Sequence, residues 1–270
     1  MPEFPCPTPV TVSVRLGGGA LDITAEPRDT ASVTISPWDG SDAARDAAEH
    51  TTVDMRGDRL IVEAPEAGSG WLLRRGTRVR VDIRVPLDCA LEIRAASADV
   101  RCRGRYGDTY VRSASGDVAV EHVAGDASIK TASGHILVDR VDGRSAVDAA
   151  SGDVTVTLAG GDVTAHTTSG DMTVDEAGGS VQATAASGSV RVGRARHGTI
   201  KVKSASGGVS VGVAQGTSVW LDVSTASGRT RSDLDVSEAP AAGGQPDLTV
   251  ALRTASGDID IHRVVASATA

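Results

Sequence analysis

The chain has 270 residues, a net charge of −8 at pH 7 and only six aromatic residues, and 40% of its residues are hydrophobic. The apolar content argues for a folded chain rather than a disordered one, and the few aromatic rings exclude a thick core built around them. No apolar run is long enough to cross a membrane as a helix, which argues against membrane insertion. The scattered basic residues argue against nucleic-acid binding, because phosphate contact needs a basic face.

Residues 1–96 show strand patterns without a fixed period. Apolar and polar residues alternate in four segments, as in strands with one buried face: Val10–Leu16, Ala31–Ser36, Arg59–Ala64 and Thr77–Pro86. Only Ser41–His50 has a helical pattern, with Ser41 or Asp42 as its N-cap. We interpret residues 1–96 as an irregular β capping region that is continuous with the repeats, since the open end of a repeat stack needs cover.

A serine–glycine pair then recurs through residues 97–264. Consecutive pairs are 18 residues apart over the central part, at Ser115-Gly116, Ser133-Gly134, Ser151-Gly152, Ser169-Gly170 and Ser187-Gly188. Ser206-Gly207, Ser227-Gly228 and Ser256-Gly257 continue the series with slippage. A fixed period of about 20 residues is typical of a solenoid, whose units stack because none can bury its apolar face alone. The serines and glycines are therefore predicted to be structural turn residues.

Each repeat contains two alternating stretches and two turns. After one pair, Val118 and Val120 lie on the same face of a predicted strand, and Gly125, ten residues after the serine, marks a second turn. A second stretch follows, with small inward residues such as Ala165 and Thr167. The sequence therefore predicts an all-β fold: a β-solenoid resembling a parallel β-helix, with about 18 residues, two short strands and two tight turns per coil.

The C-terminal part departs from the period. Ser232–Asp247 contains prolines, glycines and acids and is predicted to be an exposed loop, and residues 265–270 form a tail. The final coil, which ends after Ile261, is expected to be an uncapped end of the stack. An uncapped strand edge would allow self-association.

The residue after each serine–glycine pair forms a predicted column of chemical interest. Stacked coils bring together residues at the same offset, here Asp117, His135, Asp153 and Asp171. One interpretation is that each Asp closes its own turn by accepting local backbone N–H groups. The other is a hard metal ion held by the column, for which these four residues are weak candidates. Because the glycine-rich calcium-binding repeat pattern does not occur, we expect no metal and no cofactor.

Nothing in the pattern predicts catalysis. The repeated serines share a turn role that accounts for all of them, and the tryptophans Trp38, Trp71 and Trp220 are far apart in the sequence. The cysteines, Cys6, Cys89 and Cys102, show neither metal-ligand spacing nor a disulfide framework, and Cys102 falls at an inward position. The basic segment Trp71–Arg80 is interpreted as the solvent side of a strand. We therefore expect a protein that is not an enzyme.

The repeated units "SASGDVAV", "AASGDVTV" and "TASGDIDI", with the opening "MPEFPCPTPVTVSVRLGGGALDI", resemble a bacterial β-strand-repeat family of unknown function that is labelled "putative adhesin". The similarity spans nearly the whole chain. It implies a β-solenoid domain without assigned catalytic residues or cofactor.

These observations favour a structural or interaction module that presents a surface to a protein partner. Two alternatives stay open: a carbohydrate-binding or carbohydrate-cleaving β-helix, and self-association. The N-terminal residues carry neither a basic segment nor an apolar core, so a cytoplasmic location is expected rather than an extracellular one.

Overall fold

The computed structural model describes residues 2–65, 78–234 and 246–264, which form two compact units, Met1–Asp139 and Arg140–Ala270. The first unit contains the helix α1 (Asp42–Glu49) and the strands β1 (Glu3–Pro5), β2 (Thr11–Ala25), β3 (Thr30–Pro37), β4 (Thr52–Arg56), β5 (Arg59–Glu63), β6 (Arg78–Val85), β7 (Ala90–Tyr106), β8 (Thr109–Ser113), β9 (Val118–Val123) and β10 (Ala127–Ser133). The strand β11 (Ile136–Val141) contains the boundary between the units.

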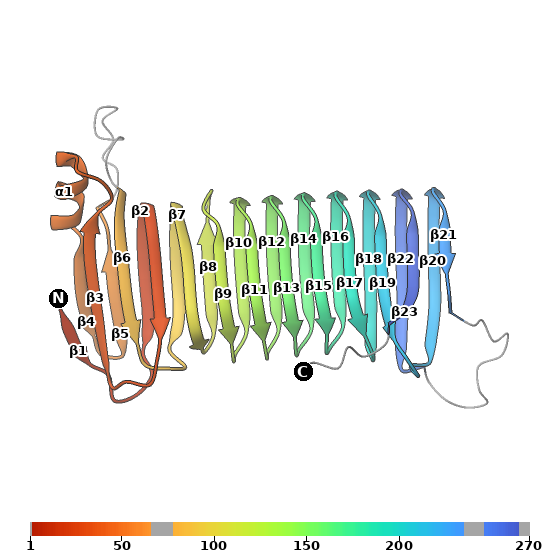
Figure 1. Ribbon diagram of the computed structural model, residues 1–270, viewed down its shortest axis with the longest axis horizontal. Coiled ribbons are helices and arrows are strands. Elements are labelled where there is room, and N and C mark those ends of the chain that lie inside the picture. Colours follow the sequence, from red (N-terminus) through yellow and green to blue (C-terminus); the bar gives the residue numbers. More distant parts are fainter. Residues whose placement is uncertain (1, 66–77, 235–245, 265–270) are drawn as a thin grey trace. The chain divides into compact units, whose positions relative to one another are not determined.

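The second unit continues the same alternation of short strands. These are β12 (Ser145–Ser151), β13 (Val154–Ala159), β14 (Val163–Ser169), β15 (Met172–Ala177), β16 (Val181–Ser187), β17 (Val190–Ala195), β18 (Gly198–Ser206), β19 (Val209–Ala214), β20 (Val219–Ser227), β21 (Thr230–Ser232), β22 (Leu248–Ser256) and β23 (Ile259–Val264). Both units are parallel β-solenoids (Figure 1), and the predicted fold class is confirmed.

The 18-residue period of the sequence sets the register of the second unit. Strand β13 pairs in parallel with β15 and β15 with β17, so that Val154, Met172 and Val190 form one column. Strands β12, β14 and β16 stack in the same way on the other face (Figure 1). The inward side chains of both faces are buried, and the alternate side chains point to the solvent. The predicted inward set, Val163, Ala165 and Thr167, is confirmed.

In the first unit, the first coil in the sequence is not the first in the stack. The long strand β2 pairs in parallel with β5 and β6 along one edge and with β7 along the other. Residues before position 97 thus already follow the coil register, with Val12 opposite Leu60 and Leu91. The two long strands β2 and β7 each bend through a corner and supply both faces of a coil.

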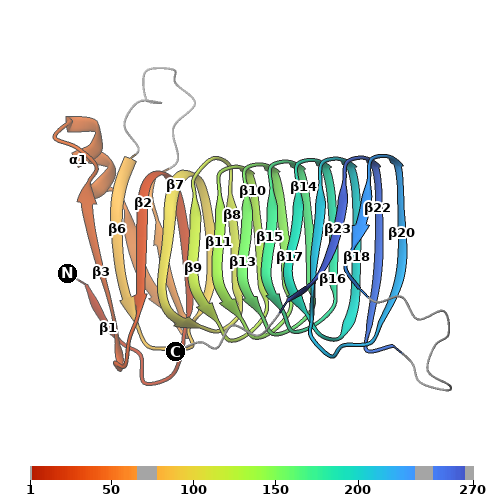
Figure 2. The ribbon, with the colours of Figure 1, turned by 45° about the vertical axis from the view of Figure 1, so that its right-hand side comes forward.

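Antiparallel strands cover the outer edge of this unit. Strand β3 pairs antiparallel with β6, β1 with β3, and β4 with β5, and α1 packs against β3 and β6 (Figure 2). The Oγ of Ser41 accepts a hydrogen bond from the backbone N–H of Ala44 at 3.2 Å, which makes Ser41 the N-cap. These antiparallel strands fit the predicted capping role, because they end the series of parallel strands to which another coil could pair.

The predicted strands before residue 97 agree with β2, β3, β5 and β6, whereas β1, β4 and the part of β7 before residue 97 were not predicted. Residues 71–77 of the basic segment and residues 265–270 of the tail lie outside the described residues, as do residues 235–245 of the predicted loop.

The expectation that the C-terminal coil ends the stack is wrong. Strand β22 pairs with β18 along one edge and with β20 along the other, and β23 likewise lies between β19 and β21. Figure 1 shows β22, in dark blue, between β18 and β20. The coil of β20 and β21 therefore lies outside the coil that follows it in the sequence. Its inward residues Val219, Leu221 and Val223 are half-buried, whereas Val250 and Leu252 of β22 are fully buried.

Candidate functional site

The serine–glycine turns stack directly on one another. Gly170 has φ +133°, and a Cβ placed there would lie 2.2 Å from the carbonyl oxygen of Gly152 in the neighbouring coil. The backbone N–H of Gly170 donates in turn to the carbonyl of Ser187 at 3.2 Å. Glycine is required because both the backbone conformation and the space exclude a side chain. At Ser133, Ser151, Ser169 and Ser187 the serine is the last residue of its strand, and the glycine that follows begins the turn.

The aspartates after these pairs bond to the next coil rather than to their own turn. In the first unit Asp117 Oδ1 accepts the N–H of His135 at 2.9 Å. In the second unit Asp153 Oδ1 accepts the N–H of Asp171 at 2.9 Å, and Asp171 Oδ1 accepts the N–H of Ser189 at 2.8 Å. Each carboxylate therefore satisfies an amide at the corner where strand pairing stops. Within the described ranges, no group of three His, Cys, Asp or Glu side chains has the arrangement of a metal site.

A second aspartate column at the opposite corner was missed from the sequence. Asp108 Oδ1 accepts the N–H of Asp126 at 2.9 Å, and Asp162 Oδ1 accepts the N–H of Ser180 at 2.8 Å. The sequence did contain a signal, since Asp108, Asp126 and Asp162 are spaced by multiples of 18 residues. Both corners therefore use the same device, which explains acidic turn residues without assigning them a ligand.

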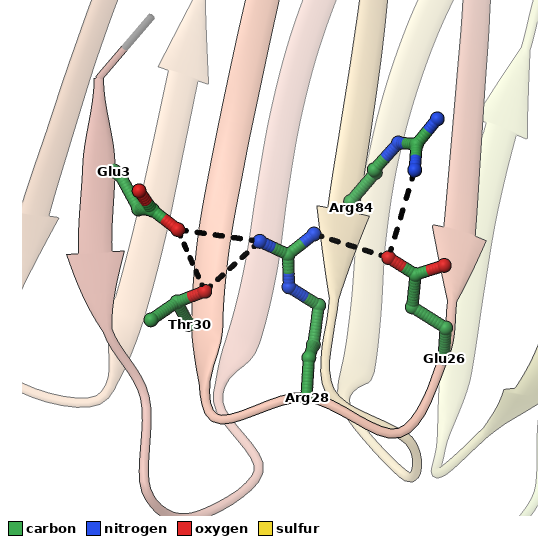
Figure 3. A network of polar contacts seen from close by, with 5 residues as sticks. All are labelled: Glu3, Glu26, Arg28, Thr30 and Arg84. Carbon is green, nitrogen blue, oxygen red and sulfur yellow. Dashed lines mark hydrogen bonds and ion pairs between the residues drawn. The ribbon is translucent and has the colours of Figure 1, made fainter.

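A network of charged side chains fixes the N-terminal strand of the first unit (Figure 3). The guanidinium of Arg28 donates to Thr30 Oγ1 at 2.9 Å and to Glu26 Oε1 at 3.2 Å, and lies 3.5 Å from Glu3. Arg84 reaches Glu26 at 3.8 Å. The Arg28 side chain is only 17% exposed. The network ties β1 to the turn between β2 and β3, and we interpret it as structural.

The three cysteines are buried and unpaired. Burial raises the pKa of Cys6, of Cys89 and, most strongly, of Cys102, so the thiols stay protonated and unreactive. Burial also raises the pKa of Tyr106, whose hydroxyl lies 2.8 Å from the carbonyls of Ile23 and Arg103. These groups belong to the core of the first unit rather than to a reactive site.

A basic groove of about 450 Å³ lies on the outer face of β18, β22 and β20 in the second unit. Its lining residues are Thr199, Lys201, Val202, Lys203, Asp222, Ala251 and Arg253. The register places Lys201, Ala251 and Asp222 in one row across the three strands, and Lys203 beside Arg253 in the next. The small side chain of Ala251 leaves the hollow between its charged neighbours.

The charges of this groove are unevenly paired. Arg253 Nη2 lies 3.1 Å from Asp222 Oδ2, and both side chains are more than half exposed. Lys201 and Lys203 are exposed and make no ion pair with any described residue. The groove therefore presents a net positive charge in a chain whose overall charge is −8.

Trp220 lies beside this groove on the edge strand β20. It is 59% exposed, and β20 alternates so that Trp220 and Asp222 point to the same outer face. Its row continues through Thr249 and Thr199. The sequence placed Trp220 only as an isolated aromatic residue. Its place in one row with Thr249 and Thr199 depends on the insertion of β22 between β18 and β20.

Each unit is a β-solenoid of short parallel coils, and the second unit carries a basic groove on the outer face of β18, β22 and β20. The chain belongs to the Toastrack DUF4097 family, whose profile matches residues 19–262. The resemblance to a family of unknown function labelled "putative adhesin" is thereby confirmed. No protein of curated function matches the chain.

Among solved structures, a "putative lipid binding protein" from Parabacteroides distasonis is similar over 97% of this chain and 95% of its own, with 12% identity and a TM-score of 0.52. A "putative adhesin" from Bacteroides fragilis shows 12% identity over 97% of this chain and 95% of its own, with a TM-score of 0.39. The first likeness supports the fold, and the second adds nothing to it. No helix among the described residues is long and apolar enough to span a membrane.

Proposed function

We propose that this protein is a non-enzymatic interaction module that binds an acidic segment of a protein partner in the basic groove of β18, β22 and β20. The observation that carries the proposal is the grouping of Lys201, Lys203 and Arg253 around the hollow over Ala251. Charge complementarity of this kind steers association and selects the partner.

Trp220 supplies the apolar part of the proposed contact. Tryptophan and arginine are enriched among the residues that contribute most to protein–protein binding. Trp220 is exposed on the same outer face, in the row of Thr249 and Thr199, and thus supports a docking surface more strongly than charge alone. The rigid parallel strands keep these groups in place, so binding requires little reorganisation.

The composition of the groove also supports a binding role rather than catalysis. Its only carboxylate, Asp222, is engaged with Arg253, so the lining offers no pair of free acids for general acid–base chemistry. Glycoside cleavage would need two carboxylates on either side of the scissile bond. A carbohydrate-binding role without cleavage is the second candidate, favoured by the exposed Trp220 ring, which offers a platform for a sugar.

The test is affinity capture from the native host, followed by binding measurements with the purified partner. The variant K201E/K203E/R253E is expected to weaken binding at least tenfold, and W220A at least fivefold. The matched control R191E/R229E/R231E makes the same change in charge at exposed positions away from the groove. Equal binding by all variants would contradict the proposal. Binding of neutral oligosaccharides that depends on Trp220 but not on the three cations would favour the second candidate.

We further propose a cytoplasmic location. The three unpaired cysteines support it, since free thiols suit a reducing compartment. Fractionation of native cells with an antibody against the protein tests this, and recovery in the medium or the envelope fraction would contradict it.

A further inference from the structure

The outermost coil of the second unit leaves a strand edge open among the described residues. Strand β20 pairs with β22 along one edge, and no described strand pairs with its other edge. The inward side chains of Val219, Leu221 and Val223 are half-buried, whereas Val250 and Leu252 of β22 are fully buried. The residues that the structure describes therefore cover the apolar core of this unit incompletely at β20.

This edge lacks the features by which strand edges usually avoid pairing. Such edges carry lysines, prolines or bulges, or are covered by another element. Residues 219–227 contain neither lysine nor proline, and their register with β22 has no shift. Their one charged residue, Asp222, lies 3.1 Å from Arg253 of β22. In the first unit, by contrast, antiparallel strands and α1 cover the outer edge.

Alternate peptide groups of β20 point to the open edge. The carbonyl of Ser218 accepts the N–H of Leu248 at 3.1 Å, so the peptide groups of even-numbered residues face β22 at the start of the strand. The two sides alternate along a parallel strand. The N–H and C=O groups of Leu221 and Val223 therefore face away from β22 and can pair with a further strand.

The form of this open end favours a second copy of the chain over an isolated peptide strand. A strand added to β20 brings inward side chains of its own, and these need a second layer to cover them, because each coil has two faces. The end coil of another molecule supplies both layers and a matching row of half-buried apolar side chains. A head-to-tail contact lacks a complementary surface, since the outer edge of the first unit is covered, so the contact has to be isologous.

We infer that two copies of the chain form a dimer in which β20 pairs antiparallel with β20 of the second copy. A two-fold axis perpendicular to the sheet keeps the inward side chains inward in both molecules. The register that pairs all 9 residues of β20 is centred on Val223. It places Trp220 opposite Ala226 of the second copy. It also places Asp222 opposite Ser224, so that no like charges face each other across the contact.

The contact is small, so the dimer should be reversible. The 9 residues of β20 extend over about 30 Å, and packed sheets are about 10 Å apart. Stable complexes usually bury about 800 Å² on each partner, which is more than an end of this size provides. A dissociation constant in the micromolar range is therefore expected. The inference does not depend on the acidic partner proposed for the groove.

Sedimentation velocity of the full chain at concentrations from about 1 to about 500 µM tests the dimer. Wild type is expected to change from monomer to dimer over this range. Asp222 and Ser224 of the second copy form a non-hydrogen-bonded pair, in which side chains lie closest, and the two-fold axis repeats the contact. Ser224→Asp should therefore weaken the dimer at least threefold, and Ser224→Arg should strengthen it at least twofold.

The matched controls are Thr164→Asp and Thr164→Arg. They make the same changes in charge at an exposed position of β14, whose two edges are both paired. Both should leave the dissociation constant within twofold of wild type. Val223→Pro removes an N–H that faces the open edge and keeps the pairing with β22, so it should abolish the dimer while the protein still melts cooperatively.

A wild type that stays monomeric at every concentration would overturn the inference, because the edge would then be covered by other residues of the chain or by another protein. Equal effects of Ser224→Asp and Ser224→Arg, or a dimer that survives Val223→Pro, would also overturn it. The groove variant K201E/K203E should dimerise like wild type, which separates this result from a failure of the proposed function.

Discussion

At the scale of single residues, the turns are determined by space and by hydrogen bonding across coils. Gly170 is kept free of a side chain by the carbonyl of Gly152, and Asp153 and Asp171 complete the bonding of amides in the next coil. The same residue types would also occur in a repeated binding site. Only the identity of the hydrogen-bond partner, a backbone N–H one coil away, distinguishes a structural aspartate from a ligand.

Replacement of Gly170 by alanine should destabilise the protein by about 2–4 kcal/mol, because it combines an unfavourable backbone conformation with a steric clash. Gly40→Ala is the matched control, since nothing lies within 4 Å of a Cβ at that position and its φ is ordinary. Urea unfolding followed by circular dichroism measures both variants. Similar midpoints for the two would show that the stacked turn tolerates a side chain.

The ion pair between Arg59 and Glu92 should make stability depend on pH. Hydrogen bonds from Arg59 hold the pKa of Glu92 below its usual range. The carboxylate is therefore favoured in the folded state, and its contribution is complete above the ordinary glutamate pKa of about 4.3 and is lost as pH falls through the lower folded value. The difference in melting temperature between wild type and Glu92→Gln should be constant above about pH 6 and shrink from about pH 5 to pH 3.

The control for this experiment is Asp175→Asn, which removes an exposed carboxylate that has no ion pair within the described residues. Its difference from wild type should vary little over the same range. A pH-independent difference for Glu92→Gln would refute a role for the ion pair.

At the scale of strands and coils, the main finding is that sequence order and stack order differ. In the first unit β2 pairs with β5 and β6 along one edge and with β7 along the other. In the second unit β22 lies between β18 and β20. Each inserted coil has both edges paired. In the second unit this leaves β20 and β21 with half-buried or exposed inward residues.

Hydrogen exchange should therefore be slower in β22 than in β20, although β22 is nearer the end of the sequence. Every amide of an inserted parallel strand points to a paired neighbour, whereas β20 pairs with one described strand only. Exchange measured by mass spectrometry on peptides from residues 219–227 and 248–256 tests this. Faster exchange in the second peptide would mean that β22 is an end strand.

The periodic part of the fold was predictable from the sequence because its spacing and alternation define the register. The insertion of β22 was not. Thr225 and Thr254 begin the same tetrapeptide, Thr-Ala-Ser-Gly, at the same point of their coils, so either coil could pack on β18. The groove could not be predicted for the same reason, because Lys201 and Asp222 share a row only when β22, with Ala251, lies between their strands.

At the scale of the whole molecule, the chain is a series of nearly equivalent coils. The free energy of unfolding is then approximately a sum over the coils and the contacts between neighbouring coils. A coil removed as a complete period should leave the remaining register intact. A cut of an odd number of residues should turn inward residues outward, because the side-chain period of a strand is two residues.

Deletion of residues 154–171 tests this property, since it joins Asp153 to Met172 and so restores the natural sequence Ser-Gly-Asp-Met. The shortened protein should fold with a strand-type circular dichroism spectrum and a cooperative melt. Deletion of residues 155–171 removes one residue fewer and serves as the control, which should be insoluble or unfolded. Folding of both proteins would show that register does not control the stack.

The placement of β22 and β23 also affects how the protein bears mechanical load. A pull on the chain beyond Val264 acts first on His262, Arg263 and Val264, which pair with β19 alone. The first half of β23, Ile259–Ile261, is paired with both β19 and β21. Extraction of the strand past Ile261 therefore has to break hydrogen bonds to two neighbours, and the force it needs should rise at that point.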